Sequence, residues 1–141
     1  MKFIKIINNH TEQEVDDIIS NFDSVSLNFI GELYLNQKHI EFNLEDGRGV
    51  MYAELEESQV NKLLSIYVKY GLDFSYEDIT KSVLFGNTPF VNEEKCEDLK
   101  AIIKIFIEDN LDTDTVLDKI SEMGIESISE QDKKVLVVQS A

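Results

Sequence analysis

The stretch IEFNLEDGRGVMYAEL, residues 40–55, decides the fold class of this chain. Apolar and polar side chains alternate on both sides of the segment DGRG at 46–49, and a period of two is typical of a strand with one buried and one wet face. A glycine-rich segment between two such strands favours a tight turn. The sequence therefore predicts an antiparallel hairpin, with strands at about 40–45 and 50–55.

The segment before this hairpin, residues 24–36, shows the same alternation. Its larger apolar side chains share one face of an extended chain, and they are Val25, Leu27, Phe29, Leu33 and Leu35. The residues between them are mostly polar, as on the wet face of a sheet. We therefore predict a first strand here, with residues 36–37 turning the chain, so that three strands form a meander.

Further strands and helices are predicted on both sides of the meander. Residues 2–7 (KFIKII) are typical of a short strand, and the alternation at 72–76 indicates another. A T-x-x-E capping box starts a helix at Thr11, and a second helix ends at Gly71. Residues 77–86 follow neither period clearly. The order β-α-β-β-β-α-β predicts an α+β fold, with two helices on one face of a mostly antiparallel sheet.

The last third of the chain is predicted to be helical. Apolar residues recur with helical spacing from about 92 to 110, and Gly124 separates two further helices. No segment rich in Gly, Ser and Pro divides the chain. The expected organisation is a single domain over residues 1–141, with the α+β sheet part at 1–86 and a C-terminal helical subdomain at 87–141.

The composition is strongly acidic. Its 28 acidic and 13 basic residues give a net charge of −15, and Arg48 is the only arginine. Arginine is well suited to gripping phosphate, and a field of this sign repels nucleic acids and anionic membranes. We therefore expect neither nucleic acid nor membrane as a partner, and a basic protein is the partner that the charge would suit. The alternative is that the charge serves solubility alone.

Two features indicate a reducing compartment. Cys96 is the only cysteine, which excludes a disulfide within the chain. Residues 1–7 lack the long apolar run of a signal peptide, and no stretch approaches the roughly 18 apolar residues of a membrane span. The expected location is the cytoplasm.

No pattern in the sequence predicts catalysis, a metal or a cofactor. Neither His10 nor His39 has a second histidine or a cysteine three or four residues away, and no G-x-S-x-G elbow is present. The acids from Asp112 onward resemble the start of a calcium loop. That loop requires a glycine at its sixth position and an acid at its twelfth, where Leu117 and Met123 stand. An enzyme is therefore the less favoured interpretation.

Residues 113–136 (TDTVLDKISEMGIESISEQDKKVL) resemble the helical-hairpin tail of some bacterial rhomboid-family membrane proteins. The similar elements are VLDKI at 116–120, GIESI at 124–128 and the mixed-charge run into Leu136. The resemblance implies a shared accessory helical module. It does not imply protease activity, because the segment carries none of the catalytic residues of that family. Residues 1–112 show no family resemblance.

The preferred functional hypothesis is a non-enzymatic module that binds another protein, for example an immunity- or inhibitor-like protein that covers a basic toxin or nuclease site. An acidic surface would speed association with such a partner. The candidate partner-binding acids are Glu41, Glu45, Asp46, Glu54, Glu56 and Glu57. Tyr34 and Tyr52 fall on the predicted outward face of the sheet and are candidates for the same contact, unless the C-terminal helices cover that face.

Two alternatives remain open at this point. One is a small-ligand-binding protein or minor enzyme with a pocket between the sheet and the C-terminal helices. The other is a homo-oligomeric structural module that uses the edge of the meander or the face carrying Tyr34 and Tyr52.

Overall fold

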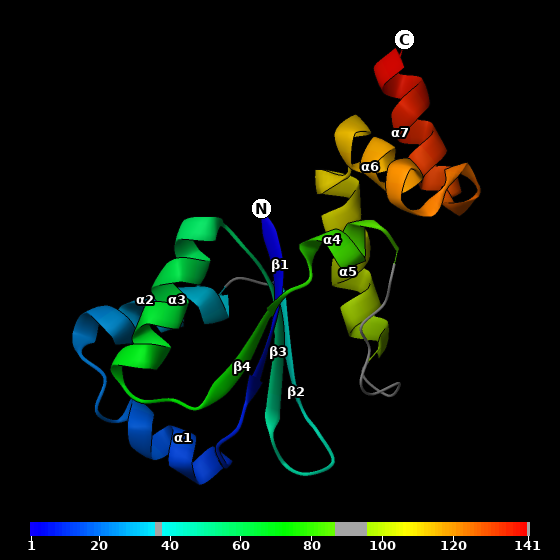
Figure 1. Ribbon diagram of the computed structural model, residues 1–141. Helices are drawn as coiled ribbons and strands as arrows, with labels where there is room; N and C mark the ends of the chain where they lie inside the picture. The colour runs from blue at the N-terminus through cyan, green and yellow to red at the C-terminus, as the bar shows by residue number, and fades with distance from the viewer. Residues whose placement is uncertain (36–37, 87–95, 141) are drawn as a thin grey trace.

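The computed structural model describes residues 1–35, 38–86 and 96–140, and it confirms an α+β fold (Figure 1). The elements in chain order are β1 (Lys2–Asn8), α1 (Glu12–Ile19), α2 (Ser24–Leu35), β2 (His39–Asn43), β3 (Gly49–Leu55), α3 (Glu57–Lys69), β4 (Phe74–Asp78), α4 (Thr80–Leu84), α5 (Cys96–Asn110), α6 (Thr113–Met123), the 3₁₀ turn η2 (Ile125–Ser127) and α7 (Glu130–Ser140).

The four strands among the described residues form one antiparallel sheet in the order β2-β3-β1-β4. β2 and β3 make the hairpin predicted at 40–55. Gly47 in its turn has a φ of +89°, a conformation that glycine adopts without the steric cost of a side chain. β4 pairs with the other edge of β1 and confirms the strand predicted at 72–76, displaced by two residues.

The prediction of a strand at 24–36 is wrong, because residues 24–35 form the helix α2. The Asp23 side chain accepts the backbone N–H of Ser26 at 2.7 Å, which is how an N-cap residue satisfies a free donor at a helix start. Phe29 is buried and Leu33 is partly buried, four residues apart on one helical face. The element order is therefore β-α-α-β-β-α-β.

One face of the sheet is covered by α1, α2 and α3, which is three helices where two were predicted (Figure 1). Its core consists of Ile4, Ile6, Phe22, Phe29, Ala53, Leu55, Val60, Leu63 and Ile66. α3 supplies its apolar stripe to this core. α1 contributes less, since none of its residues is fully buried.

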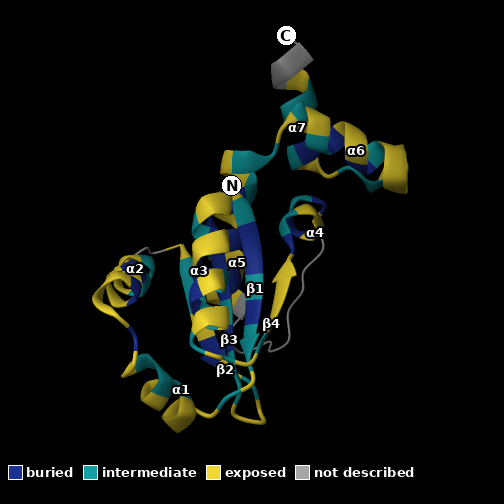
Figure 2. Ribbon diagram, turned by 60° about the vertical axis from the view of Figure 1, so that its left-hand side comes forward, coloured by how far each residue is buried: buried dark blue, intermediate teal, exposed yellow. Residues whose placement is uncertain are grey.

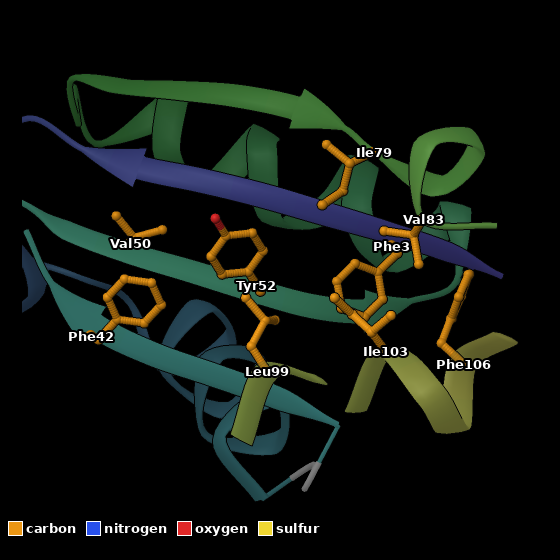
Figure 3. Close-up of a cluster of buried hydrophobic side chains, with 9 residues drawn as sticks. All are labelled: Phe3, Phe42, Val50, Tyr52, Ile79, Val83, Leu99, Ile103 and Phe106. Atoms are coloured by element: carbon orange, nitrogen blue, oxygen red, sulfur yellow. The ribbon is translucent and has the colours of Figure 1, made fainter. Parts of the chain in front are cut away.

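The opposite face of the sheet is covered by α4 and α5 (Figure 1). Figure 3 shows the core between these two helices and the sheet. It is formed by Phe3, Phe42, Val50, Tyr52, Ile79, Val83, Leu99, Ile103 and Phe106. Phe3 of β1 and Phe106 of α5 meet edge to face with ring centroids 5.2 Å apart. α5 therefore shares a core with the sheet, although it lies in the predicted helical subdomain.

α6 and α7 lie beyond the end of the sheet at which β1 begins (Figure 1). They confirm the two helices predicted on either side of Gly124, which has a φ of +86° where α6 ends. The predicted helix start near residue 92 and the predicted boundary at 86/87 fall at or within 87–95, outside the described residues. Among the described residues, no helix has the length and apolar composition to cross a membrane.

Candidate functional site

The six acids predicted as one binding surface do not lie together. Glu45 and Asp46 are exposed in the β2–β3 turn, whereas Glu56 and Glu57 are exposed at the start of α3. The seven residues of β3 separate these pairs by about 20 Å of extended strand. Asp46 is also paired with Arg48, whose Nε lies 2.7 Å from Oδ2. The prediction assumed neighbours in sequence to be neighbours in space, and a strand between them carries them apart.

Glu54 is not available on the surface of this structure. Its side chain is 4% exposed, and one of its carboxylate oxygens lies 3.7 Å from the ammonium of Lys38. Alternation along β3 turns Glu54 to the same side as Val50 and Tyr52, which is the side that α5 covers. Glu54 is therefore buried in this structure, and its contact with a partner stays a prediction.

The two predicted tyrosines lie on opposite sides of the sheet. Tyr52 is 0% exposed, and its ring stacks on Phe42 with centroids 5.9 Å apart in the core under α5 (Figure 3). The helix α5 therefore covers the face of the sheet that carries Tyr52, which is the alternative that the sequence left open. Tyr34 lies on α2 instead of a strand, and it is 53% exposed.

A groove with a volume of about 460 Å³ opens between α1, α2 and the sheet. This volume lies in the range of ligand pockets, about 300–1,000 Å³. The apolar lining includes Ile6 and Met51 of the sheet, Val15 and Ile19 of α1, and Ile30 of α2. Figure 2 shows α1 largely in the exposed colour, with no buried residue. The apolar stripe predicted for α1 is therefore only partly covered.

The charged groups on the groove are acidic. Glu12 and Asp16 of α1 and Glu41 of β2 line it, and all three residues are exposed. Among the described residues that line the groove, none is a lysine or an arginine. An apolar floor beside exposed carboxylates is suited to a ligand that is both apolar and cationic.

His10 also lines the groove and holds the start of α1 in place. Its Nε2 accepts the backbone N–H of Asp73 at 2.7 Å, and its Nδ1 lies 3.1 Å from a carboxylate oxygen of Glu14. This arrangement requires a neutral imidazole with its proton on Nδ1. The hydrogen bond from His10, followed by those from Thr11, holds the pKa of Glu14 below its usual value. No pattern in the sequence predicts this link to the α3–β4 loop.

A smaller apolar hollow of about 30 Å³ adjoins the groove under α2. Tyr34 and Tyr67 line both spaces, and Glu41 stands on the groove beside them. Burial, and then the negative charge of Glu41, raise the pKa of Tyr67 to about 12. Partial burial, the charge of Glu41 and a hydrogen bond to it also raise the pKa of Tyr34. Glu41 is thus the predicted acid that the structure brings together with a predicted tyrosine.

The groove lies on the opposite face of the sheet from the predicted pocket. The ligand-binding alternative placed a pocket between the sheet and the C-terminal helices, where the large side chains of Figure 3 fill the space. Glu12 and Asp16 were not predicted as site residues. The sequence does show that α1 is amphipathic, with acids beside its apolar stripe. Because any surface helix has this pattern, it did not distinguish Glu12 and Asp16 as site residues.

Comparisons of this chain with protein-family descriptions, with curated proteins and with solved structures find no match. Within the described residues, no group of three or more His, Cys, Asp and Glu side chains is placed to hold a metal ion. The chemistry of the groove is therefore the basis for a functional proposal.

Proposed function

We propose that this protein is a non-catalytic binding module that holds a basic, amphipathic segment of another protein in the groove between α1, α2 and the sheet. The observation that carries the proposal is the pairing of an apolar floor with a charged lining that is entirely acidic over the described residues. An immunity- or inhibitor-like role, in which the module covers a basic surface of its partner, is one form of this function.

The overall charge supports the same partner chemistry. A net charge of −15 attracts a cationic segment over a range set by the Debye length, about 8 Å at physiological salt. Once the segment is close, its apolar side chains gain from burial on Val15, Ile19 and Ile30, which are partly exposed in the groove. Charge then speeds the encounter, and apolar contact holds the complex.

The test measures the affinity of a labelled helix-forming peptide of leucine and lysine by fluorescence anisotropy. The double variant Glu12→Lys/Asp16→Lys reverses two acids on the groove. The matched control Glu108→Lys/Asp109→Lys makes the same net-charge change on exposed residues of α5. We expect the groove variant to weaken binding at least tenfold, and the control to weaken it less than threefold, as roughly expected for close and distant charges.

Equal losses in the two variants would mean that the peptide responds to net charge alone, and the groove would not be the binding site. Absence of binding to the unaltered protein at low salt would reject the proposal. In host lysate, the natural partner is the basic protein that the unaltered chain and the α5 control retain and that the groove variant releases.

A small-ligand-binding protein is the second candidate, and the volume of the groove favours it. About 460 Å³ accommodates a metabolite-sized molecule, with His10 and Glu41 as polar contacts. A thermal-shift screen of cationic and neutral metabolites tests this candidate. A shift of the melting temperature that the Glu12→Lys/Asp16→Lys variant abolishes would favour it over the peptide-binding function.

A further inference from the structure

Three side chains from three elements meet at one corner of the groove. They are Tyr34 of α2, Glu41 of β2 and Tyr67 of α3. Both tyrosines border the groove and also the small apolar hollow beside it. Glu41 is the cross-strand partner of Met51, which lines both spaces together with Tyr34 and Tyr67, and this register places the carboxylate beside the two rings. The corner is therefore where the groove combines a negative charge with aromatic surface.

The rings at this corner are positioned by other aromatic contacts. The ring of Tyr67 packs edge to face against Phe74, with centroids 5.1 Å apart and planes at 77°. The ring of Tyr34 meets His39 in the same manner, at 5.6 Å and 80°. Edge-to-face contacts restrict the orientation of each ring. Binding of a ligand at this corner therefore costs little side-chain entropy, because the two rings are already held in place.

Glu41 keeps its negative charge available. Over the described part of the chain, no lysine, arginine or histidine forms an ion pair with it. Other exposed acids differ in this respect: Asp23 lies 2.9 Å from Lys69, and Asp46 lies 2.7 Å from Arg48. Tyr34 and Tyr67, which border the same corner, carry phenols, and a phenol donates a hydrogen bond without neutralising a carboxylate.

We propose that this corner is the anchor of the groove and binds one lysine or arginine side chain of the basic segment. The cation lies against the Glu41 carboxylate and the rings of Tyr34 and Tyr67, where Coulomb attraction and cation–π attraction act together. The aliphatic stem of that side chain lies over Ile30 and Met51, which line both the groove and the hollow. This inference rests on the proposed function and names the chemical group that the site selects.

The first test uses small probes and does not require a peptide to bind. The whole 141-residue chain, labelled with ¹⁵N, is titrated with n-butylguanidinium, n-butylammonium and neutral n-butanol. We expect the two cations to give saturable amide shifts around residues 34, 41 and 67, and n-butanol to give none of comparable size. Glu41→Gln should weaken the cation affinity roughly tenfold, while Glu108→Gln on the exposed face of α5 leaves it unchanged.

The rings are tested separately from the charge. Tyr34→Leu removes a ring and should weaken the binding of n-butylguanidinium, whereas Tyr34→Phe keeps the ring and should retain most of it. Both substitutions are at a half-exposed residue, and the spectrum of each variant shows whether it folds. Equal shifts with n-butanol, or full cation affinity in Glu41→Gln, would overturn the anchor.

The leucine–lysine peptide separates this inference from the proposed function. If the peptide loses affinity in Glu12→Lys/Asp16→Lys but not in Glu41→Gln, the groove binds a basic segment without this anchor and the inference fails alone. If the small cations bind at the corner and the peptide does not bind, the proposed function fails, and the inference of a protein side chain as ligand fails with it. Loss of peptide affinity in both variants supports both.

Discussion

Lys119 and Asp132 form an ion pair inside the C-terminal hairpin of α6 and α7. The Lys119 ammonium lies 2.9 Å from Oδ2 of Asp132, and the side chains are only 7% and 2% exposed. Asp132 also accepts the backbone N–H of Ser129 at 2.8 Å, and the Ser129 hydroxyl accepts the N–H of Asp132 at 3.1 Å. This reciprocal capping starts α7, so one carboxylate both caps a helix and joins it to its neighbour.

We predict that Lys119→Met destabilises the protein by about 3–5 kcal/mol, because it leaves the Asp132 carboxylate buried without its cation. Adding Asp132→Leu to Lys119→Met should recover part of this loss, since no buried charge then remains. Urea unfolding at pH 7 measures both effects. The control is Lys133→Met, which breaks an exposed pair with Glu130 and should change the stability by about 0.5 kcal/mol or less.

At acid pH, the difference in the free energy of unfolding between the unaltered protein and Lys119→Met should disappear. Burial alone would raise the pKa of Asp132, but its hydrogen bonds with Lys119 and Ser129 outweigh that effect and hold the pKa below its usual value. A folded-state pKa below the unfolded one stabilises the fold above about pH 4, and this contribution is lost as the pH falls through the folded value. If Lys119→Met loses no more stability than Lys133→Met at pH 7, the buried ion pair of Lys119 and Asp132 does not stabilise the fold as proposed.

At the level of single residues, chemistry was easier to predict than location. The sequence singled out Glu41 and Tyr34, and both lie at the corner of the groove. It also singled out Glu54 and Tyr52, which the fold buries under α5. An acid and a tyrosine both suit a contact surface for a basic partner. Which side of β3 stays exposed, however, depends on α5, a helix more than forty residues further along the chain.

The element that the sequence misassigned is α2. Its apolar residues at 25, 27, 29, 33 and 35 fit a period of two, whereas Phe29, Ile30 and Leu33 fit the helical spacing. Short apolar segments of this kind satisfy both patterns. The cap at Asp23 and packing of Phe29 against the sheet select the helix. Val25 and Leu35 consequently remain exposed, at 65% and 83%.

A proline pair tests the helical assignment of residues 24–35. Asn28→Pro lies in the helix interior and should cost about 3 kcal/mol, because proline removes a backbone donor and clashes with the preceding turn. Ser24→Pro occupies the first helical position, where the donor is free of helical bonding, and should be nearly neutral. Urea unfolding and far-ultraviolet circular dichroism provide the measurements. Equal losses at the two positions would argue against a helix that begins at Ser24.

At the scale of the whole molecule, charge opposes folding. With 28 acids against 13 bases, the compact chain repels itself. We predict that raising NaCl from about 10 mM to about 300 mM increases the melting temperature by about 3 °C, which corresponds to about 1 kcal/mol for a chain of this size. Scanning calorimetry at pH 7 measures the shift.

The charge-reversal control used for the groove also tests this effect. Each acid-to-lysine change adds two units of charge, so Glu108→Lys/Asp109→Lys takes the net charge from −15 to −11. That variant should be more stable at low salt and should gain less from added NaCl. A melting temperature that does not rise with NaCl in the unaltered protein would show that self-repulsion is not a significant term.

The sequence by itself determined the α+β class, the hairpin at 40–55, the helices around the sheet other than α2 and α4, and the acidic charge. Each of these follows from local periodicity, turn residues or composition. The tertiary structure alone decided that α5 covers Tyr52, that residues 24–35 pack as a helix, and that α1 and α2 leave a groove against the sheet. These features depend on which face of each element is covered by residues far away in the chain, and no local pattern carries that information.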